Sequence, residues 1–293
     1  MIKWFILLIC CTTKAALSFD GILPYETTQL KSQSGAGIAS LLTNEATILN
    51  PASVVFTNQS TLYYERSSFD IDEKSDQRSS EFQEGSNEGF IAVDSSNSVK
   101  GGANYSYQKQ AGGSKLTYGL SLAAPIAKTA AAGFIFSHNE EESILLGRKI
   151  YTQIDFGYTH VLSDRITFAL TIHDLTHVNP EYFKQTAGIF YTVNAFLDLM
   201  IDAGSGDVKN REKKSFNKWA AQLQAGKNFY LRYGRFYDRT INFQGDSLGA
   251  SWIGPKFALE YAVKNYEKIL ENTDTIFMEE SFIETSFALT VLF

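Results

Sequence analysis

The last residues of the chain alternate between two kinds of side chain from Ile283 onward. A period of two is that of a β-strand, whose successive side chains point to opposite faces. A tilted strand crosses a bilayer in about 9 to 11 residues. The pattern therefore predicts a membrane-crossing strand, and leaves open the last strand of a soluble sandwich. One face would carry Ile283, Thr285, Phe287, Leu289, Val291 and Phe293, and the other Glu284, Ser286, Ala288 and Thr290.

The N-terminus has the parts of a secretory signal peptide. Lys3 supplies a positive charge, residues 4–11 form an apolar run, and Ala16 to Ser18 provide small residues for cleavage. The run is too short to be a transmembrane helix, and no other stretch approaches 18 consecutive apolar residues. We therefore predict that residues 1–18 are a signal peptide and that the mature chain is exported.

Both cysteines, Cys10 and Cys11, lie in this predicted signal peptide. The mature chain would then contain no disulfide. A lipoprotein cleavage site requires a small residue before its cysteine, and Ile9 does not fit. The formal net charge of −6 becomes more negative once Lys3 and Lys14 are removed, which argues against nucleic acid as a partner.

The rest of the chain contains a series of short segments in which apolar and polar residues alternate. We expect fourteen strands, although an ambiguous turn at Val193 and Asn194 would allow twelve. The expected strands are Thr61 to Phe69, Glu88 to Val93, Gly101 to Gln108, Lys115 to Ala124, Ala131 to His138, Tyr151 to Val161, Arg165 to His173, Gln185 to Val193, Ala195 to Ala203, Lys218 to Gly226, Phe229 to Asp238, Ser247 to Ile253, Lys256 to Lys264 and Ser281 to Phe293.

The connections between these segments alternate in length, as they do in an outer-membrane barrel with short periplasmic turns and long outer loops. The short ones include Leu162 to Asp164, Lys227 to Asn228 and Gly254 to Pro255, and the long ones Asp70 to Asn87, Asn139 to Lys149, Asp174 to Lys184, Gly204 to Asn217, Arg239 to Asp246 and Asn265 to Glu280. No segment has a helical period over twelve residues, which makes an α/β enzyme a poor fit. We therefore predict an all-β protein, a transmembrane antiparallel β-barrel spanning residues 61–293, in a bacterial outer membrane.

Residues 19–60 precede the first strand and carry two motifs. Ser34 to Ser40 form a glycine- and alanine-containing run, and Asn50, Pro51 and Ala52 follow an alanine-containing stretch. Together with the strand count and the terminal Phe293, these motifs resemble the FadL superfamily of outer-membrane transporters, although Ser53 stands where that motif usually has glycine. The resemblance implies a plug folded into the barrel lumen. It also implies that Phe287, Leu289, Val291 and Phe293 form the signal read by the barrel-assembly machinery.

The resemblance further implies a monomeric barrel for passive uptake of hydrophobic compounds, such as long-chain fatty acids. Its alternative is a PorV-like barrel that anchors a protein complex and transports nothing. The chain is shorter than typical fatty-acid transporters, so its outer loops are small. Besides membrane lipid and lipopolysaccharide, the expected partner is thus either a hydrophobic ligand or a protein. The plug and gating candidates are Gly35, Gly37, Asn50, Pro51 and Ala52, and the loop residues that could contact a ligand are Tyr182, Phe183, Phe243, Ile276 and Phe277.

Catalytic and metal-binding patterns are weak. His173 and His177 are four residues apart, but the segment lacks the glutamate of a zinc-protease motif and lies at a predicted strand end. The carboxylates of residues 70–88 could hold a divalent cation weakly, but a solvated loop is the better explanation for them. We therefore expect no enzyme activity, no cofactor and no resident metal.

Overall fold

The computed structural model describes residues 22–71, 85–110, 113–143, 147–178, 183–208, 212–269 and 281–293. The predicted signal peptide lies outside the described residues. Within them, three short helices precede fourteen strands. The helices are α1 (Thr28–Ser32) and the 3-10 helices η1 (Asn44–Thr47) and η2 (Pro51–Phe56). The strands are β1 (Thr61–Ile71), β2 (Gly85–Asp94), β3 (Lys100–Gln110), β4 (Gly113–Ala127), β5 (Ala130–Ser143), β6 (Gly147–Ser163), β7 (Ile166–His173), β8 (Lys184–Asn194), β9 (Leu197–Val208), β10 (Glu212–Gln224), β11 (Phe229–Asp238), β12 (Phe243–Ile253), β13 (Phe257–Lys268) and β14 (Ser281–Leu292).

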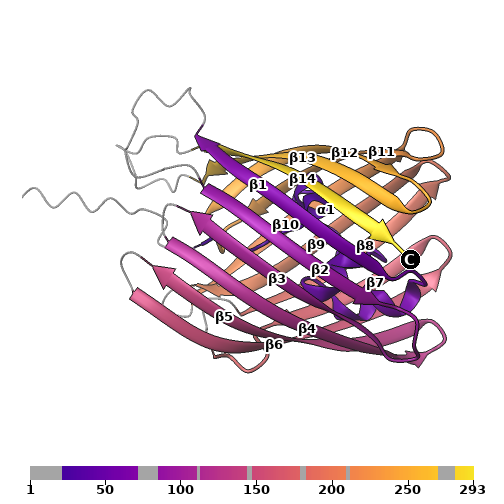
Figure 1. Ribbon diagram of the computed structural model, residues 1–293, viewed down its shortest axis with the longest axis horizontal. Coiled ribbons are helices and arrows are strands. Elements are labelled where there is room, and N and C mark those ends of the chain that lie inside the picture. Colours follow the sequence, from indigo (N-terminus) through magenta and orange to yellow (C-terminus); the bar gives the residue numbers. More distant parts are fainter. Residues whose placement is uncertain are drawn as a thin grey trace, which may run out of the picture.

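Each strand pairs antiparallel with its neighbour in sequence, and β14 pairs with β1 to close the barrel (Figure 1). The closing register runs from Thr61 opposite Leu292 to Ile71 opposite Phe282. A closed sheet leaves no strand edge unpaired, which lipid requires. The prediction of fourteen strands is confirmed, and twelve is excluded because β8 and β9 are separate strands joined by a tight turn.

The alternation of β14 matches the two sides of the wall. Glu284 and Ser286 are buried toward the lumen, whereas Phe287 is 53% exposed and Leu289 is 38% exposed on the outside. The backbone N–H of Phe293 donates to the carbonyl of Ser60 at 3.0 Å, which continues the pairing with the N-terminal end of β1. The apolar face predicted from the sequence is therefore the outer face.

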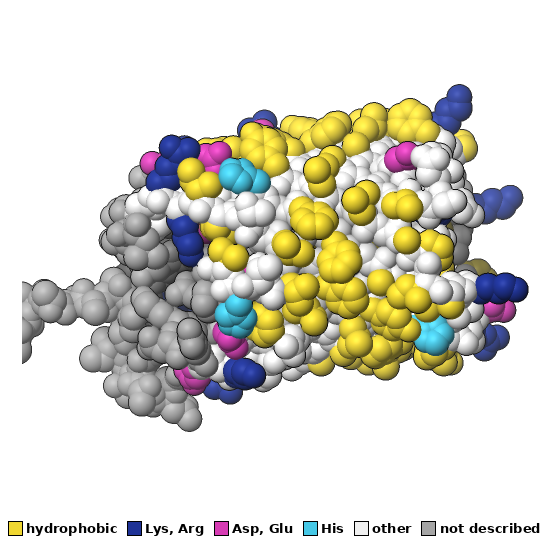
Figure 2. Space-filling view, turned by 90° about the horizontal axis from the view of Figure 1, so that it is seen from below, with side chains coloured by type: hydrophobic (Ala, Val, Ile, Leu, Met, Phe, Trp, Pro, Cys, Tyr) yellow, Lys and Arg dark blue, Asp and Glu magenta, His cyan; other side chains and the backbone are white. Residues whose placement is uncertain are grey.

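The outer surface carries a broad apolar belt. Figure 2 shows hydrophobic side chains over the middle of the visible face, with charged side chains gathered toward the two ends. Large apolar side chains that are more than half exposed include Leu120, Leu122, Ile189, Ile201 and Leu248. Such a surface is unfavourable in water and matches the hydrocarbon core of a bilayer. The barrel is therefore a membrane-spanning one. In the described part of the chain, no helix has the length and apolar character needed to cross a membrane.

Several strands are longer than the sequence pattern indicated. Residues 139–143 and 147–150, predicted as loop, continue β5 and β6 as a paired ladder, and residues 204–208 and 212–217 do the same for β9 and β10. The extensions are rich in polar residues on both faces, so they lose the apolar alternation that marks a strand in lipid. Backbone pairing nevertheless continues, and Glu140 and Arg148 form an ion pair across it at 2.7 Å.

Candidate functional site

The N-terminal segment lies inside the barrel near the end that holds the C-terminus (Figure 1). Helix α1 contacts β11 to β14, and η2 contacts β3 to β6. The segment therefore touches walls that lie far apart around the barrel. Its residues 27–34 are almost all buried, as expected for a plug surrounded by strands.

Gly35 and Gly37 form the turn that follows α1. Their φ angles are 75° and 135°, which L-residues with a side chain rarely adopt. The turn aims two backbone N–H groups, those of Gly37 and Ile38, at Asp202 Oδ2 of β9, at 2.7 and 3.1 Å. The glycine run therefore fixes the plug to the wall through a backbone anion site.

Asn50 connects the two halves of the plug to each other and to the barrel. Its Nδ2 donates to the carbonyl of Ile38 at 2.6 Å and to Thr159 Oγ1 of β6 at 2.8 Å. Its Oδ1 accepts from the N–H of Ala52 at 3.1 Å, which caps η2, and Pro51 takes the first helical position. Asn50 and Ala52 are 2% and 0% exposed. The Asn-Pro-Ala motif is thus the point where the plug meets β6.

The barrel wall is shaped to receive the plug by glycines, which the sequence analysis did not single out. A Cβ at Gly157 would overlap Asn50 Oδ1 and lie 2.6 Å from Pro51 Cδ, and one at Gly133 would lie 3.0 Å from Pro51 Cβ. Other wall glycines face plug atoms in the same way; they are Gly89, Gly102, Gly188, Gly234 and Gly249. Strand glycines with alternating neighbours give no sequence sign of this role, because the contact depends on the fold.

A buried ionic cluster holds α1 against the seam between β1 and β14. Lys31 Nζ lies 3.1 Å from Glu65 Oε1 and 3.1 Å from Glu284 Oε1, and the three side chains are at most 2% exposed. Burial alone would lower the pKa of Lys31, but Glu284 and Glu65 outweigh it and raise that pKa. Hydroxyls of Tyr63 and Tyr266 donate to the two carboxylates. Lys31 therefore stays charged, and the cluster was not predicted from the sequence.

A second ionic contact lies at the N-terminal side of the plug. Glu26 Oε2 is 2.6 Å from Lys264 Nζ of β13, and Glu26 Oε1 is 3.7 Å from Lys218 Nζ of β10. Burial opposes ionisation of Glu26, yet Lys264 and Lys218 hold its pKa below the ordinary value. A Cβ at Gly35 would overlap Glu26 Oε1 and lie 2.6 Å from Lys218 Nζ. Gly35 therefore leaves the space that this contact occupies.

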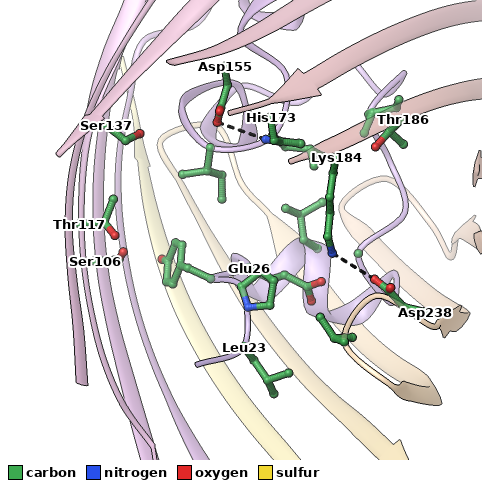
Figure 3. A pocket seen from close by; sticks show the side chains of 18 of the residues that line it. Leu23, Glu26, Ser106, Thr117, Ser137, Asp155, His173, Lys184, Thr186 and Asp238 are labelled. Carbon is green, nitrogen blue, oxygen red and sulfur yellow. Dashed lines mark hydrogen bonds and ion pairs between the residues drawn. The ribbon is translucent and has the colours of Figure 1, made fainter. Parts of the chain in front are cut away.

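A cavity of about 220 Å³ opens between the plug and the ends of the strands on the loop side. Figure 3 shows its lining, with Asp155 beside His173, Lys184 beside Asp238, and Glu26 and Leu23 on the plug side. The lining combines apolar and charged groups. The lysines are Lys115, Lys184, Lys218 and Lys264, and the apolar residues include Leu23, Ile38, Leu49, Ile135, Phe216, Phe236 and Ile241.

Aromatic rings accompany these lysines. Lys184 Nζ and Lys218 Nζ lie 5.5 and 5.9 Å from the centre of the Phe216 ring, and Lys264 Nζ lies 4.6 Å from that of Phe236. Contacts of this kind stabilise an ammonium group inside an apolar setting. The cavity therefore combines apolar side chains with both charges, because Glu26, Asp155, Asp202 and Asp238 line it as well and Lys184, Lys218 and Lys264 pair with Asp238 and Glu26.

The two histidines singled out in the sequence serve different contacts. His173 Nδ1 lies 3.1 Å from Asp155 Oδ2, whereas His177 Nε2 lies 3.3 Å from Asp207 Oδ2. In the described parts of the chain, no group of three or more His, Cys, Asp or Glu side chains is arranged to hold a metal ion.

The loop residues predicted to contact a ligand differ in where the structure places them. Tyr182, Ile276 and Phe277 lie outside the described residues. Phe183 precedes β8, with its ring 4.5 Å from that of His177. Phe243 is not on a loop surface: it begins β12, is 2% exposed, and packs in an aromatic cluster with Phe236, Tyr266 and Phe282. The sequence prediction placed it in a loop because the polar residues around it obscure the start of β12.

Comparisons with known proteins identify solved structures that have the same fold. No protein-family model matches the sequence, and no curated protein matches it. Among solved structures, the monoaromatic hydrocarbon channel CymD aligns with a TM-score of 0.65 at 12% identity, over 90% of this chain and 96% of CymD. A Pseudomonas aeruginosa FadL homologue aligns with a TM-score of 0.64 at 12% identity, over 93% of this chain and 99% of the homologue.

The toluene transporter TbuX of Ralstonia pickettii aligns with a TM-score of 0.63 at 11% identity, over 92% of this chain and 99% of TbuX. Nearly the whole length of each of these structures is covered. At such low identities the similarity establishes the fold and leaves the activity to be argued from the site. The chain is a fourteen-stranded barrel with an internal N-terminal plug, and it has the fold of the FadL-like outer-membrane channels.

Proposed function

We propose that this protein is an outer-membrane channel for the passive uptake of hydrophobic compounds, with long-chain fatty acids as its substrate class. The observation that carries the proposal is the cavity above the plug, which places apolar side chains beside lysine ammonium groups within a lipid-facing barrel. The monoaromatic hydrocarbon channel CymD and the toluene transporter TbuX have the same fold, which supports transport as the general activity. The proposal involves no catalytic step.

The cavity lies where an entering molecule would arrive. Gln108, Asn139, Lys184 and Asp238 line it from near the loop-side ends of β3, β5, β8 and β11. Transfer of an alkyl chain from water to apolar surroundings is favourable by about 0.8 kcal/mol per buried CH₂. A carboxylate at the end of that chain would pair with a lysine. Capture therefore needs no energy source.

Ile38 and Leu49 of the plug form part of the cavity lining, and in this proposal the plug closes the path from the cavity onward. Passage requires the plug to shift. We propose that Gly35, Gly37, Asn50, Pro51 and Ala52 form the gate, since they carry the turn at Asp202 and the contact with Thr159. Both contacts join the plug to side chains of the wall, so a shift of the plug can break them without disturbing the strand pairing.

Native mass spectrometry of the barrel, purified gently from its own membrane and followed by lipid extraction, tests this function. We expect a bound fatty acid or hydrocarbon that is lost when Lys218 and Lys264 are both replaced by Met. Replacement of Lys256, which lies in the short turn between β12 and β13, is the matched control. A stoichiometric protein partner with no ligand would instead indicate a PorV-like anchoring barrel and would overturn the proposal.

A further inference from the structure

The outside of the barrel has two short turns in contact at the end that holds the C-terminus (Figure 1). Residues 225–228 join β10 to β11, and residues 254–256 join β12 to β13. Because β11 and β12 pair with each other, the turns meet, and the N–H of Ile253 donates to the carbonyl of Asn228 at 2.8 Å. Each turn carries one exposed lysine, Lys227 or Lys256. Two ammonium groups are therefore attached to adjoining turns.

The side chains of these two lysines have no counter-ion in the part of the chain that the structure describes. Their hydrogen bonds there use the backbone carbonyls: Lys227 O accepts from Gln224 Nε2 at 3.3 Å, and Lys256 O accepts from the N–H of Leu292 at 2.8 Å. The turns are thus fixed by their backbone, while both ammonium groups are available to an anion from outside the barrel.

Three aromatic rings lie beside the lysines on the outer wall. Phe229 of β11 is directly opposite Trp252 of β12, and the centre of the Trp252 ring is 5.0 Å from that of Phe257 in β13. Phe229 and Phe257 are 56% and 43% exposed. Because the neighbouring Ser251 is buried on the lumen side, Trp252 points outward. The rings form an apolar surface between the two turns.

This surface lies at the edge of the apolar belt. Leu231 and Leu259, which are 47% and 38% exposed, continue it toward the middle of the barrel. Aromatic rings prefer the boundary between hydrocarbon and headgroups, and lysine side chains extend from that boundary to place their ammonium among the headgroups. Short turns of an outer-membrane barrel face the periplasm. The rings and lysines therefore lie in the inner leaflet, which consists of phospholipid.

A molecule that fits this surface carries a negative group and apolar chains together. An anionic phospholipid has both, because its phosphate can pair with the ammonium groups while its acyl chains lie on the rings. An acidic soluble protein would satisfy the lysines and leave the lipid-facing rings without a partner. The position of the rings between the lysines therefore favours the phospholipid.

We propose that Lys227 and Lys256, together with the rings of Phe229, Trp252 and Phe257, form a binding site for an anionic phospholipid of the inner leaflet. The phosphate lies between the two ammonium groups, and the acyl chains follow the outer face of β11 to β13. The site is on the outside of the wall, separate from the internal cavity, and it does not depend on the proposed uptake function.

Trp252 can report occupation of this site, because brominated lipids quench tryptophan fluorescence on contact. Trp219→Phe leaves Trp252 as the sole tryptophan of residues 19–293. The exported chain with this change is placed in phosphatidylcholine vesicles that contain increasing fractions of brominated phosphatidylglycerol. We expect quenching well above that for random mixing. In Lys227→Gln/Lys256→Gln, the preference for phosphatidylglycerol over phosphatidylcholine should fall by about fivefold for each lysine replaced.

Lys128→Gln/Arg165→Gln is the matched control. It removes two exposed cations from the short turns between β4 and β5 and between β6 and β7, at the same end of the barrel, and it should leave the preference at Trp252 unchanged. All substituted cations are in exposed turns, and a folded gel band checks that each variant is intact. Quenching that follows random mixing, an unchanged preference in Lys227→Gln/Lys256→Gln, or an equal loss in the control would each overturn the proposed site.

Discussion

Asn50 Nδ2 lies 2.8 Å from Thr159 Oγ1, a contact that joins the plug to β6 across 109 positions of sequence. Asn50 is 2% exposed and also donates to the carbonyl of Ile38. The same side chain therefore caps η2, holds the preceding turn and fixes both to the wall. Its position explains why an Asn-Pro-Ala motif lies just before the first strand.

Asn50→Ala should loosen the plug while leaving the barrel folded. The change removes the partner of Ile38 O and Thr159 Oγ1 in a buried site, which costs about 1–3 kcal/mol. We expect faster hydrogen exchange in residues 44–56 and larger open-state conductance in planar bilayers. Asn97→Ala, in the exposed turn between β2 and β3, is the matched control and should change neither. Unchanged exchange in Asn50→Ala would show that this contact does not hold the plug.

Gly157→Ala should act on the same contact from the wall side. A Cβ there would overlap Asn50 Oδ1 and press on Pro51 Cδ, and overpacking of this kind costs about 1–3 kcal/mol. Gly226→Ala places a methyl group in open space at a turn, so it should strain that turn without moving the plug. Hydrogen exchange of residues 44–56 should rise in the first variant alone; an equal rise in both would contradict the close fit.

Lys31→Met should be the most damaging single change in the plug. It leaves Glu65 and Glu284 buried without their cation, and breaking a buried pair in this way costs about 3–5 kcal/mol. Arg66→Met removes a pair with Glu88 whose side chains are 70% and 46% exposed, and it should cost at most about 1 kcal/mol. The temperature at which the folded gel band disappears should fall clearly for Lys31→Met. Equal temperatures for the two variants would refute the role of the cluster.

Glu45 should make the docking of the plug depend on pH. Burial raises the pKa of its carboxyl to about 7, the Glu260 carboxylate adds to this, and Thr27 and Arg232 oppose it. Because the docked form prefers the protonated carboxyl, its stabilising contribution is complete below the ordinary value of 4.5 and is lost as pH rises toward 7. The full loss is on the order of 3 kcal/mol.

Open-state conductance should therefore increase between pH 5 and pH 8. Glu45→Gln keeps an oxygen to accept the hydrogen bond from Thr27 and cannot ionise, so its conductance should vary less over this range. A wild-type conductance that stays constant from pH 5 to pH 8 would contradict this prediction. An equal change of conductance with pH in Glu45→Gln would show that another group sets the pH dependence.

The barrel could be predicted from the sequence because apolar and polar side chains must alternate along a strand that faces lipid. In β14, Phe287 and Leu289 point outward and Glu284 points inward. The ends of the strands were harder to predict. Once β5 and β6 rise beyond the apolar belt, both faces become polar, and only the backbone pairing of partners such as Glu140 and Ile150 shows that the strands continue. Phe243 was misplaced for the same reason.

The plug motif was visible as Gly35, Gly37 and Asn50, but its partners were not. Asp202 and Thr159 lie more than 100 residues away from the groups they bind. Lys31 likewise meets Glu65 and Glu284 only because β1 and β14 close the barrel. Such contacts depend on strand register, which a single sequence does not specify.

Uptake of dodecanoate into vesicles with a lipopolysaccharide outer leaflet tests the central claim most directly. Vesicles containing the full chain should take up dodecanoate faster than empty vesicles while excluding glucose, and Lys218→Met/Lys264→Met should reduce this uptake. Equal dodecanoate uptake with and without the barrel would contradict the account.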